Sequence, residues 1–275
     1  YYEGDELQNI TAPAGFNEVT IEGISSDGSI LVGYCRRISE NKYYPFKWTR
    51  GVPTQLDSPE MTLLDEPITI GTMARGCSAD GSVIYGSVWD NFTGVYWKDD
   101  QMDYVGKEFI KKHTVVSGGG QVQLTVLDRP ILYAERFNMS SNGKYLAITF
   151  LETVSENKND VAYTYPAYMD RETGEFKILY DLPGAFKKGQ GRSISNNGTL
   201  SLVGIEDRVN SGYIYNVRNG STITMSDFIQ SEYGFAFNQT ESYIQRFAGN
   251  GEIIMGGTYI YEGSALESWY MSVLE

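Results

Sequence analysis

The chain has 275 residues, of which 41% are apolar, 30 are Gly and 21 are Tyr, and its formal net charge at pH 7 is −13. This length suits one or two domains, and the apolar content is that of a folded protein rather than a disordered one. The negative charge argues against nucleic-acid binding and polybasic membrane binding, and one His with two Cys cannot supply the four ligands of a structural zinc site.

A short turn motif recurs five times along the chain. Its glycines are separated by 53, 62, 55 and 53 residues. The copies are Ser25-Ser26-Asp27-Gly28, Ser78-Ala79-Asp80-Gly81, Ser140-Ser141-Asn142-Gly143, Ser195-Asn196-Asn197-Gly198 and Gly249-Asn250-Gly251. Because Asp-Gly and Asn-Gly between apolar runs favour a hairpin with a type I′ turn, each copy predicts two antiparallel strands.

The segments around each turn repeat as well. A first strand is predicted at 19–21, 72–75, 134–136, 191–193 and 244–246, and a second at 30–33, 83–86, 145–149, 200–204 and 253–256. An aromatic third strand follows at 44–48, 95–97, 167–169, 213–215 and 269–271, and a fourth at 54–56, 102–105, 176–179 and 222–225. Four strands per unit of about 55 residues predict an all-β fold, a β-propeller of five four-stranded blades that forms a single domain over residues 1–275.

The two ends of the chain complement each other in this scheme. The fifth repeat reaches its third strand at Trp269, and the sequence given ends at Glu275, without a fourth strand. Glu6 to Ile10 resembles a fourth strand and precedes the first repeat. Because a closed ring must protect its edge strands, we expect the N-terminal strand to complete the last blade.

Two stretches depart from the repeat. We expect one or two helical turns over 106–113, and a helix over 226–232 with Ser226 as its N-cap. The longest interval also contains three glycines at 118–120 and an apolar run at 122–126, which predict an extra hairpin or excursion. Such insertions are either functional loops or plain connectors.

The first two repeats resemble the HAF family of bacterial extracellular repeats. The residues that carry the resemblance are Gly23 to Gly28 with Val32-Gly33 and Phe46-Lys47-Trp48, and Gly76 to Gly81 with Trp97. The resemblance covers about the first hundred residues. It implies a β-propeller-like fold and export in a bacterium, to the periplasm or the cell surface, and it transfers no catalytic residue.

Other features bear on the compartment. The chain begins at Tyr1, so we expect that an upstream segment has been removed, and no apolar run is long enough to span a membrane. Cys35 and Cys77 are either a disulfide pair or two buried thiols, and two cysteines in a chain of this length favour thiols.

Charged residues on the first strands are the main candidate site. In a propeller these strands line the central channel, and five residues lie at about the same offset before the turn: Glu22, Arg75, Arg136, Arg192 and Arg246. The offset differs by one residue in the third and fifth repeats, where we expect a turn of different length. Guanidinium groups bind carboxylates with two parallel hydrogen bonds, so four converging arginines predict a binding site for an anion. The alternative is that these arginines pair with Glu18, Glu22 and Glu135 and fill the channel.

Aromatic residues outside the strands form a second candidate surface. Trp89 and Phe92, near Asn91, and Tyr43 in the first repeat are expected in loops, where they could stack on sugar rings or anchor a protein partner. The alternative is that the aromatic residues pack between blades.

The interpretation that we favour is an exported β-propeller that acts as a binding or interaction module for a carbohydrate, an anionic ligand or a protein. No catalytic residue, metal or cofactor is assigned. The alternative is a carbohydrate-active enzyme of the glycoside hydrolase type that uses Glu22 or Glu135, since such enzymes place two carboxylates in one pocket. Carboxylates that share an open pocket would favour the enzyme, whereas acids paired with arginines would favour the binding module.

Overall fold

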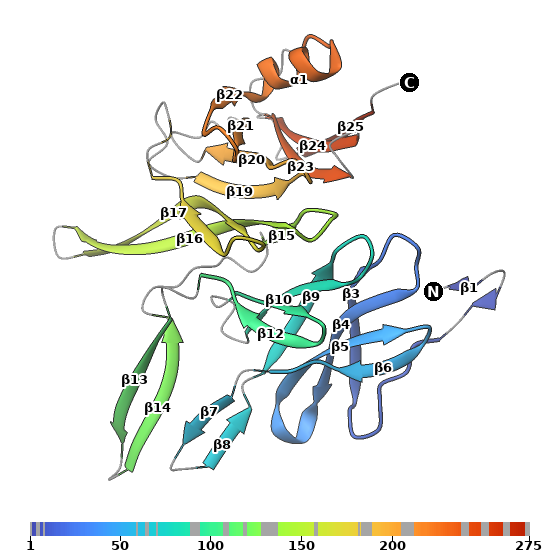
Figure 1. The fold of residues 1–275 in the computed structure, drawn as a ribbon, viewed down its shortest axis with the longest axis vertical. Coiled ribbons are helices and arrows are strands. Elements are labelled where there is room, and N and C mark those ends of the chain that lie inside the picture. The colour runs from blue at the N-terminus through green and yellow to red at the C-terminus, as the bar shows by residue number, and fades with distance from the viewer. Residues whose placement is uncertain are drawn as a thin grey trace. The chain divides into compact units, whose positions relative to one another are not determined.

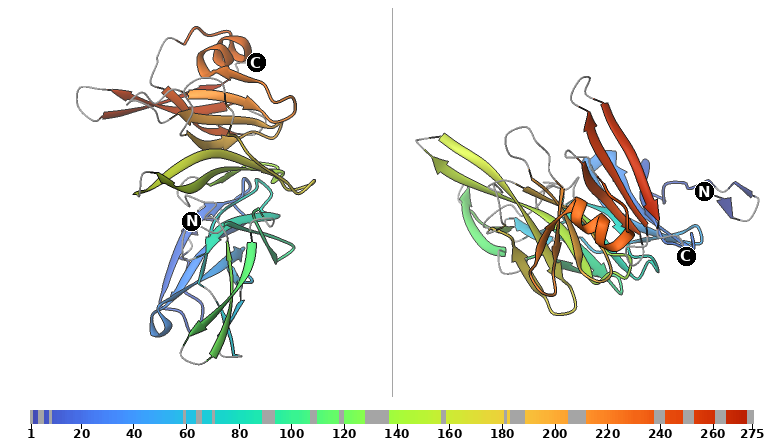
Figure 2. Two further views of the ribbon diagram at one scale, coloured as in Figure 1. Left: turned by 90° about the vertical axis from the view of Figure 1, so that its left-hand side faces the viewer. Right: turned by 90° about the horizontal axis from the view of Figure 1, so that it is seen from above.

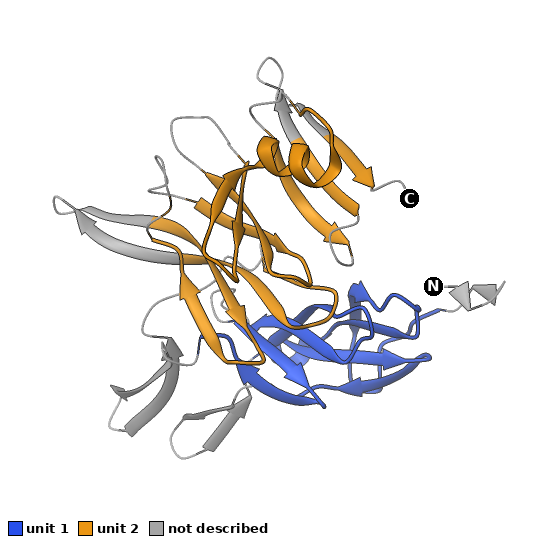
Figure 3. Ribbon diagram, turned by 45° about the horizontal axis from the view of Figure 1, so that its top comes forward, with its two compact units in different colours: residues 1–129 blue, residues 130–275 orange. Residues whose placement is uncertain are grey.

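A computed structural model describes most of the repeats. The described residues are 9–58, 71–88, 94–106, 137–156, 159–180, 182, 189–204, 212–237, 242–248, 253–260 and 265–272. The backbone alone is described for 151–156, 159–162, 258–260 and 265–267, and for short strands within 2–7, 60–69 and 110–127. The chain divides into two compact units, residues 1–129 and 130–275, and each is treated by itself below (Figure 3).

Unit 1 contains the first two repeats as two antiparallel sheets of four strands, in which strand order follows chain order (Figure 1). The first sheet consists of β3 (Glu18–Ile24), β4 (Ile30–Arg37), β5 (Lys42–Thr49) and β6 (Val52–Gln55). The second consists of β9 (Thr72–Cys77), β10 (Val83–Val88), β11 (Gly94–Lys98) and β12 (Gln101–Tyr104). All eight strands predicted for these repeats are confirmed.

Unit 2 contains the other three repeats. The third sheet consists of β15 (Asn138–Met139), β16 (Tyr145–Glu156), β17 (Asn159–Asp170) and β18 (Glu175–Ile178). The fourth consists of β19 (Gly189–Ile194), β20 (Thr199–Gly204), β21 (Gly212–Asn216) and β22 (Thr222–Thr224). The fifth has three strands among the described residues, β23 (Ser242–Ala248), β24 (Ile253–Ile260) and β25 (Ala265–Ser272). The segment 134–136, where the first strand of the third repeat was predicted, lies outside the described residues.

The N-terminal strand is observed in part. Residues Glu6–Leu7 (β2) form a short hairpin with Tyr2–Glu3 (β1), in which Tyr2 is opposite Leu7. In the described part of the chain, β25 pairs only with β24. Completion of the last sheet by the N-terminal strand therefore stays a prediction.

The insertions of unit 1 form a sheet that the repeat pattern does not contain. Its strands, in spatial order, are β13 (Ile110–Ser117), β14 (Gly120–Leu127), β7 (Glu60–Leu63) and β8 (Glu66–Thr69). The extra hairpin is confirmed, but the helical turns expected over 106–113 are wrong, because β13 pairs with β14 along its whole length, from Ile110 opposite Leu127 to Ser117 opposite Gly120. The second expected helix is confirmed as α1 (Met225–Tyr233), with Thr224 rather than Ser226 as its N-cap.

The first four copies of the turn motif are each closed by their own side chains, and the fifth copy, at 249–251, lies outside the described residues. In the first copy, Asp27 Oδ1 accepts hydrogen bonds from Ser25 Oγ (2.7 Å), Ser29 N (3.0 Å) and Ser29 Oγ (2.8 Å), and Ile30 N donates to Ser25 Oγ (3.0 Å). The same arrangement recurs around Asp80, Asn142 and Asn197. This network explains why the Ser-x-Asp/Asn-Gly spacing repeats.

The predicted type I′ geometry of these turns is wrong. Only the glycine has a positive φ, as at Gly28 (74°), because the preceding Asp or Asn is fixed in a negative-φ conformation while its side chain binds the serines. Turns with two consecutive positive φ values join third and fourth strands instead, at Arg50-Gly51 (49° and 79°) and Asp99-Asp100 (53° and 63°).

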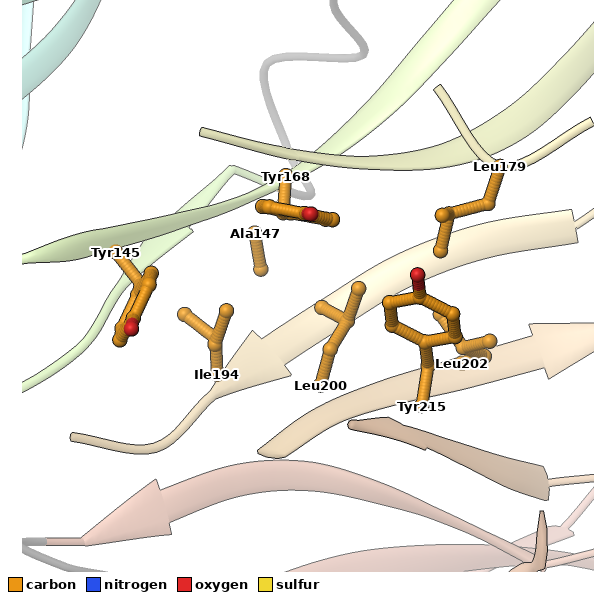
Figure 4. Packing of buried hydrophobic residues seen from close by; sticks show 8 residues of the cluster. All are labelled: Tyr145, Ala147, Tyr168, Leu179, Ile194, Leu200, Leu202 and Tyr215. Atoms are coloured by element: carbon orange, nitrogen blue, oxygen red, sulfur yellow. The ribbon is translucent and has the colours of Figure 1, made fainter. Parts of the chain in front are cut away.

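The core lies between the faces of consecutive sheets. The residues packed between the third and fourth sheets in Figure 4 are Tyr145, Ala147, Tyr168, Leu179, Ile194, Leu200, Leu202 and Tyr215. Helix α1 lies beside the fourth and fifth sheets (Figure 2), where Met225, Phe228 and Ile229 join the buried Ile214 and Ile254. Residues on both faces of the central strands are buried, as along β10, where all six residues are buried, because successive side chains of a strand point to opposite faces of the sheet.

The close approach of the first two strands in a sheet gives a prediction about stability. A Cβ on Gly33 would lie 1.9 Å from the carbonyl oxygen of Thr20. We expect Gly33→Ala to lower the free energy of unfolding by about 3 kcal/mol or more, because backbone must move to relieve the clash. Gly174→Ala, with φ at 77° and no atom within 4 Å, is the control, and we expect it to cost about 1 to 2 kcal/mol. Equal losses in urea unfolding would contradict this.

The turn network also gives a prediction about acid stability. Hydrogen bonds from Ser25 and then Ser29 lower the pKa of Asp27 from 3.8 to about 2, and Ser78 lowers the pKa of Asp80 in the same way. A lowered pKa stabilises the fold above the unfolded-state value and loses that contribution as the pH falls toward the folded-state value. We therefore expect the variant with Asp27→Asn and Asp80→Asn, which copies the third and fourth repeats, to lose less thermal stability between pH 4 and pH 2 than the parent. A steeper loss would refute the assignment.

Candidate functional site

In four of the five repeats, a bulge in the described first strand places one residue away from the regular ladder. The register between first and second strands shifts by one residue, leaving Glu22, Arg75 and Arg192 as the extra residues of β3, β9 and β19. In β23 the extra residue is Gln245, one before Arg246. The offset predicted from the sequence is therefore confirmed in three repeats, whereas Arg246 follows the bulge. Bulges of this kind re-aim side chains.

The bulge residues of unit 1 form an ion pair. Arg75 Nη1 lies 3.3 Å from Glu22 Oε1, and the guanidinium of Arg75 lies 5.9 Å from the ring centre of Tyr34. Both charged side chains are about a quarter exposed (25% and 29%). This is the pairing that we gave as the alternative to an anion site, so in unit 1 the acid and the arginine satisfy each other.

In unit 2 a neutral amide joins the first strands of three repeats. Asn138, which is 6% exposed, donates from Nδ2 to the carbonyl oxygen of Arg192 (2.5 Å), and its Oδ1 accepts a hydrogen bond from Arg246 Nη1. The guanidinium of Arg192 lies 5.1 Å from the ring centre of the buried Tyr243. We refer to Asn138, Arg192, Tyr243 and Arg246 as the Asn138 cluster.

Arg246 differs from Arg75 in the charge of its partner. Its side chain is exposed, and within the described ranges no carboxylate oxygen lies within 4 Å of it. Its hydrogen-bond partner there is the uncharged Asn138. Among the described residues, the positive charge of Arg246 is thus oriented by Asn138 of a neighbouring repeat, and this uncharged partner does not neutralise it.

Several of the residues predicted for the site are not described by the structure. Arg136, Glu135, Trp89, Asn91 and Phe92 lie outside the described residues. The structure brings Glu22 and Arg75 together in unit 1, and it links Arg192 and Arg246 through Asn138 in unit 2.

Two further expectations are settled by local geometry. Tyr43, expected in a loop, belongs to β5 and packs edge to face against Tyr34 at 5.2 Å. Cys35 and Cys77 are free thiols, and burial raises the pKa of Cys35 to about 12 and that of Cys77 to about 11. Both are therefore protonated near neutral pH and are poor nucleophiles.

A cavity of about 300 Å³ lies between the first two repeats of unit 1. Ile30, Ile84 and Trp97 form its apolar part, and its polar part contains Asp80, Asp99, Asp100 and Lys47. Lys47 Nζ lies 2.5 Å from Asp100, and Asp80 serves the turn network. Among the residues that the structure describes, no group of three or more His, Cys, Asp or Glu is arranged to hold a metal ion.

Asn138 and Tyr243 were not predicted from the sequence as site residues. Asn138 lies five residues before the turn glycine of its repeat, the position that Gly23, Gly76, Ser193 and Arg246 hold in the other repeats. A comparison of this position across the repeats would have distinguished Arg246, the long cationic residue, and Asn138, the amide, from the glycines and the serine. That these two residues bind each other was not visible in the sequence.

Comparison with known proteins supports the fold. No family model and no curated protein matches the chain, so the resemblance to HAF repeats stays a prediction. The β-propeller domain of the Trilobed protease from Pyrococcus furiosus matches at 13% identity over 94% of this chain and 70% of that one, with a TM-score of 0.50. An oligogalacturonate lyase from Vibrio parahaemolyticus matches at 8% identity over 94% and 67%, with a TM-score of 0.51.

A third structure matches more loosely, a TolB from Acinetobacter baumannii at 11% identity and a TM-score of 0.48. The match covers 90% of this chain, which spans about half (51%) of that TolB. Taken with the sheets described above, the likenesses at a TM-score of 0.50 or more show an all-β chain built from the sheets of a β-propeller. Among the described residues, no helix is long and apolar enough to cross a membrane.

Proposed function

We propose that the protein is an exported binding module, a β-propeller formed by residues 1–275. We further propose that it binds an acidic saccharide through the saccharide's carboxylate groups, at Arg192 and Arg246 on the first strands of unit 2. The observation that carries the proposal is the exposed guanidinium of Arg246, which is held by the neutral Asn138 beside the backbone of Arg192. Arginine offers two parallel hydrogen bonds to a carboxylate, and it binds best where its charge is not already neutralised.

The enzyme alternative receives less support from the same residues. A glycoside hydrolase needs an acid that is available to protonate or attack the sugar. Glu22, the candidate that the structure describes, is engaged with Arg75. This pairing of an acid with an arginine is the arrangement that favours a binding module.

Substitution of the arginine tests the binding site. We expect Arg246→Gln to weaken binding of a galacturonate trisaccharide about tenfold or more, because a charge-assisted hydrogen bond is lost. Arg218→Gln removes the same charge from an exposed turn of unit 2 and should leave the affinity within about twofold, as expected for a distant surface charge. Isothermal titration calorimetry measures both, with Arg192→Ala as a second variant of the site. Equal affinities for the parent and the two site variants would overturn the carboxylate site.

We also propose that the five sheets close into one ring through the N-terminal strand. After β6, Leu56 is buried against the second repeat, and Trp97 of that repeat donates from Nε1 to the carbonyl oxygen of Asp57 (2.7 Å). Ile10 packs against the cluster of Trp48 in the first repeat as Leu56 packs against that of Trp97. This parallel supports the proposal that the segment before Ile10 serves as a fourth strand that precedes the first repeat.

Two features of the described residues support this closure. Trp48 is 1% exposed, yet its Nε1 has no hydrogen-bond partner within the described ranges, whereas the equivalent Trp97 is satisfied. In the last sheet, Ile253, Met255 and Tyr270 leave apolar surface exposed, and Met255 is opposite Tyr270 on one face. Packing of that face and pairing of β25 would bury surface that is costly to expose.

Hydrogen exchange tests the closure. We expect Leu7→Pro, which removes a backbone donor from the N-terminal strand, to speed amide exchange in 265–272 about tenfold, because an edge strand is less protected than a paired one. Peptides that cover β22 are the internal control and should not change. If 265–272 exchanges at the same rate in both proteins, the N-terminal strand does not pair with β25.

A further inference from the structure

The amide of Asn138 contacts two different repeats at once. Its donor end holds the backbone of the bulge residue Arg192, at 2.5 Å, and its acceptor end holds the side chain of Arg246. Asn138 itself is 6% exposed, so the amide has little access to water. A buried amide that satisfies one donor and one acceptor has a defined orientation, and neither end can be exchanged without loss.

The neighbouring repeats show what other residues do at this position. Ser193 accepts a hydrogen bond from the backbone of Phe247 (3.1 Å), which ties β19 to β23 without contacting a charged side chain. Gly23 approaches Gly76 so closely that a Cβ would lie 2.9 Å from its Cα. Both arrangements hold adjacent strands together, but only Asn138 also holds a guanidinium.

The comparison with unit 1 shows the importance of charge. There the acid Glu22 holds Arg75 in an ion pair. A carboxylate at position 138 would be nearly the same size as the amide, but it would pair with Arg246 and would lose the donor that holds the carbonyl of Arg192. The residue at position 138 therefore decides whether the positive charge of Arg246 is already paired within the protein. With the amide, the charge stays available to an external anion.

We propose that Asn138 is the positioning residue of the carboxylate site: it orients Arg246 toward the ligand and, being uncharged, leaves the guanidinium free to select a carboxylate over its neutral ester. This inference rests on the proposed function. It adds the class of group that is recognised, an ionised carboxylate on a saccharide, and the residue that sets this preference.

The test compares three variants of the full chain. Asn138→Asp adds a carboxylate beside Arg246. Asn142→Asp adds the same charge in an exposed turn where Asp27 and Asp80 occur naturally in other repeats, and it is the matched control. Asn138→Ser stays neutral and copies Ser193, so it removes the contact with Arg246 without adding a charge.

The first measurement needs no ligand. Phenylglyoxal modifies accessible arginines, and peptide mass mapping gives the rate at Arg246. We expect Asn138→Asp to slow this rate about threefold, as for a surface ion pair, and Asn138→Ser and Asn142→Asp not to slow it. Equal rates in the parent and Asn138→Asp would overturn the role of Asn138, whether or not any saccharide binds.

The second measurement uses a galacturonate trisaccharide and its methyl ester. We expect the parent to bind the acid in preference to the ester, Asn138→Asp to lose about tenfold in affinity for the acid, and Asn142→Asp to bind as the parent does. Asn138→Ser should also bind more weakly, because Arg246 has lost the group that orients it. If the parent binds neither compound, the proposed function is wrong, and if both Asn138 variants bind as the parent does, the positioning role is wrong.

Thermal unfolding of each variant shows whether it is folded under the conditions of measurement. Should Asn138→Asp not fold, Asn138→Ser decides the question. Unchanged affinity for the acid in that variant would contradict the proposal, and a loss that leaves the rate of Arg246 modification undiminished would support it.

Discussion

The tightest packing on which this fold depends is between the first strands of consecutive repeats. These strands approach each other at the residue five positions before the turn glycine. In the first two repeats the approach is met by two glycines, and a Cβ on Gly23 would nearly touch Gly76. In the later repeats the strands are held by side chains instead, through Asn138 to Arg192 and through Ser193 to Phe247. Backbone groups at this depth must find partners, so the first four repeats place either a glycine or a small polar residue at this position. Arg246 is the long side chain at this position, and its place beside Asn138 follows from this constraint.

The repeated turn fixes the register that this approach requires. Its serine and its Asp or Asn accept hydrogen bonds from the backbone N–H groups of the two residues after the glycine, so the second strand begins at a set distance from the turn. Successive turns also contact each other, since Ser26 N donates to the carbonyl oxygen of Ala79 and Asn142 N donates to Asn196 Oδ1. A one-residue slip in the pairing of two strands would turn every side chain to the opposite face. The repeated turn sequence prevents such a slip by fixing where the second strand begins.

Much of the fold could be predicted from the sequence because its signals are local and repeated. Turn glycines, alternating strands and aromatic third strands each appear several times, so errors in one copy are corrected by the others. The strand at 110–117 was missed because its partner strand, not its own sequence pattern, determines it. The bulge was also hidden, since it depends on the pairing of two strands, so the one-residue difference in the offset of Arg246 could be counted in the sequence but not interpreted. The ion pair of Glu22 and Arg75 could be anticipated as an alternative, whereas the neutral partner of Arg246 could not.

A cationic site in a protein of net charge −13 is subject to two opposing electrostatic effects. The many carboxylates repel an anion at long range, and salt largely screens this repulsion beyond about 10 Å at 0.1 M ionic strength. The contact between a guanidinium and a carboxylate acts at hydrogen-bond distance and depends more on orientation than on the distant field. Specificity for a carboxylate therefore has to come from a held guanidinium with an uncompensated charge. The net negative charge then disfavours polyanions that cannot make that contact. A neutral amide such as Asn138 can hold the guanidinium in place without neutralising its charge.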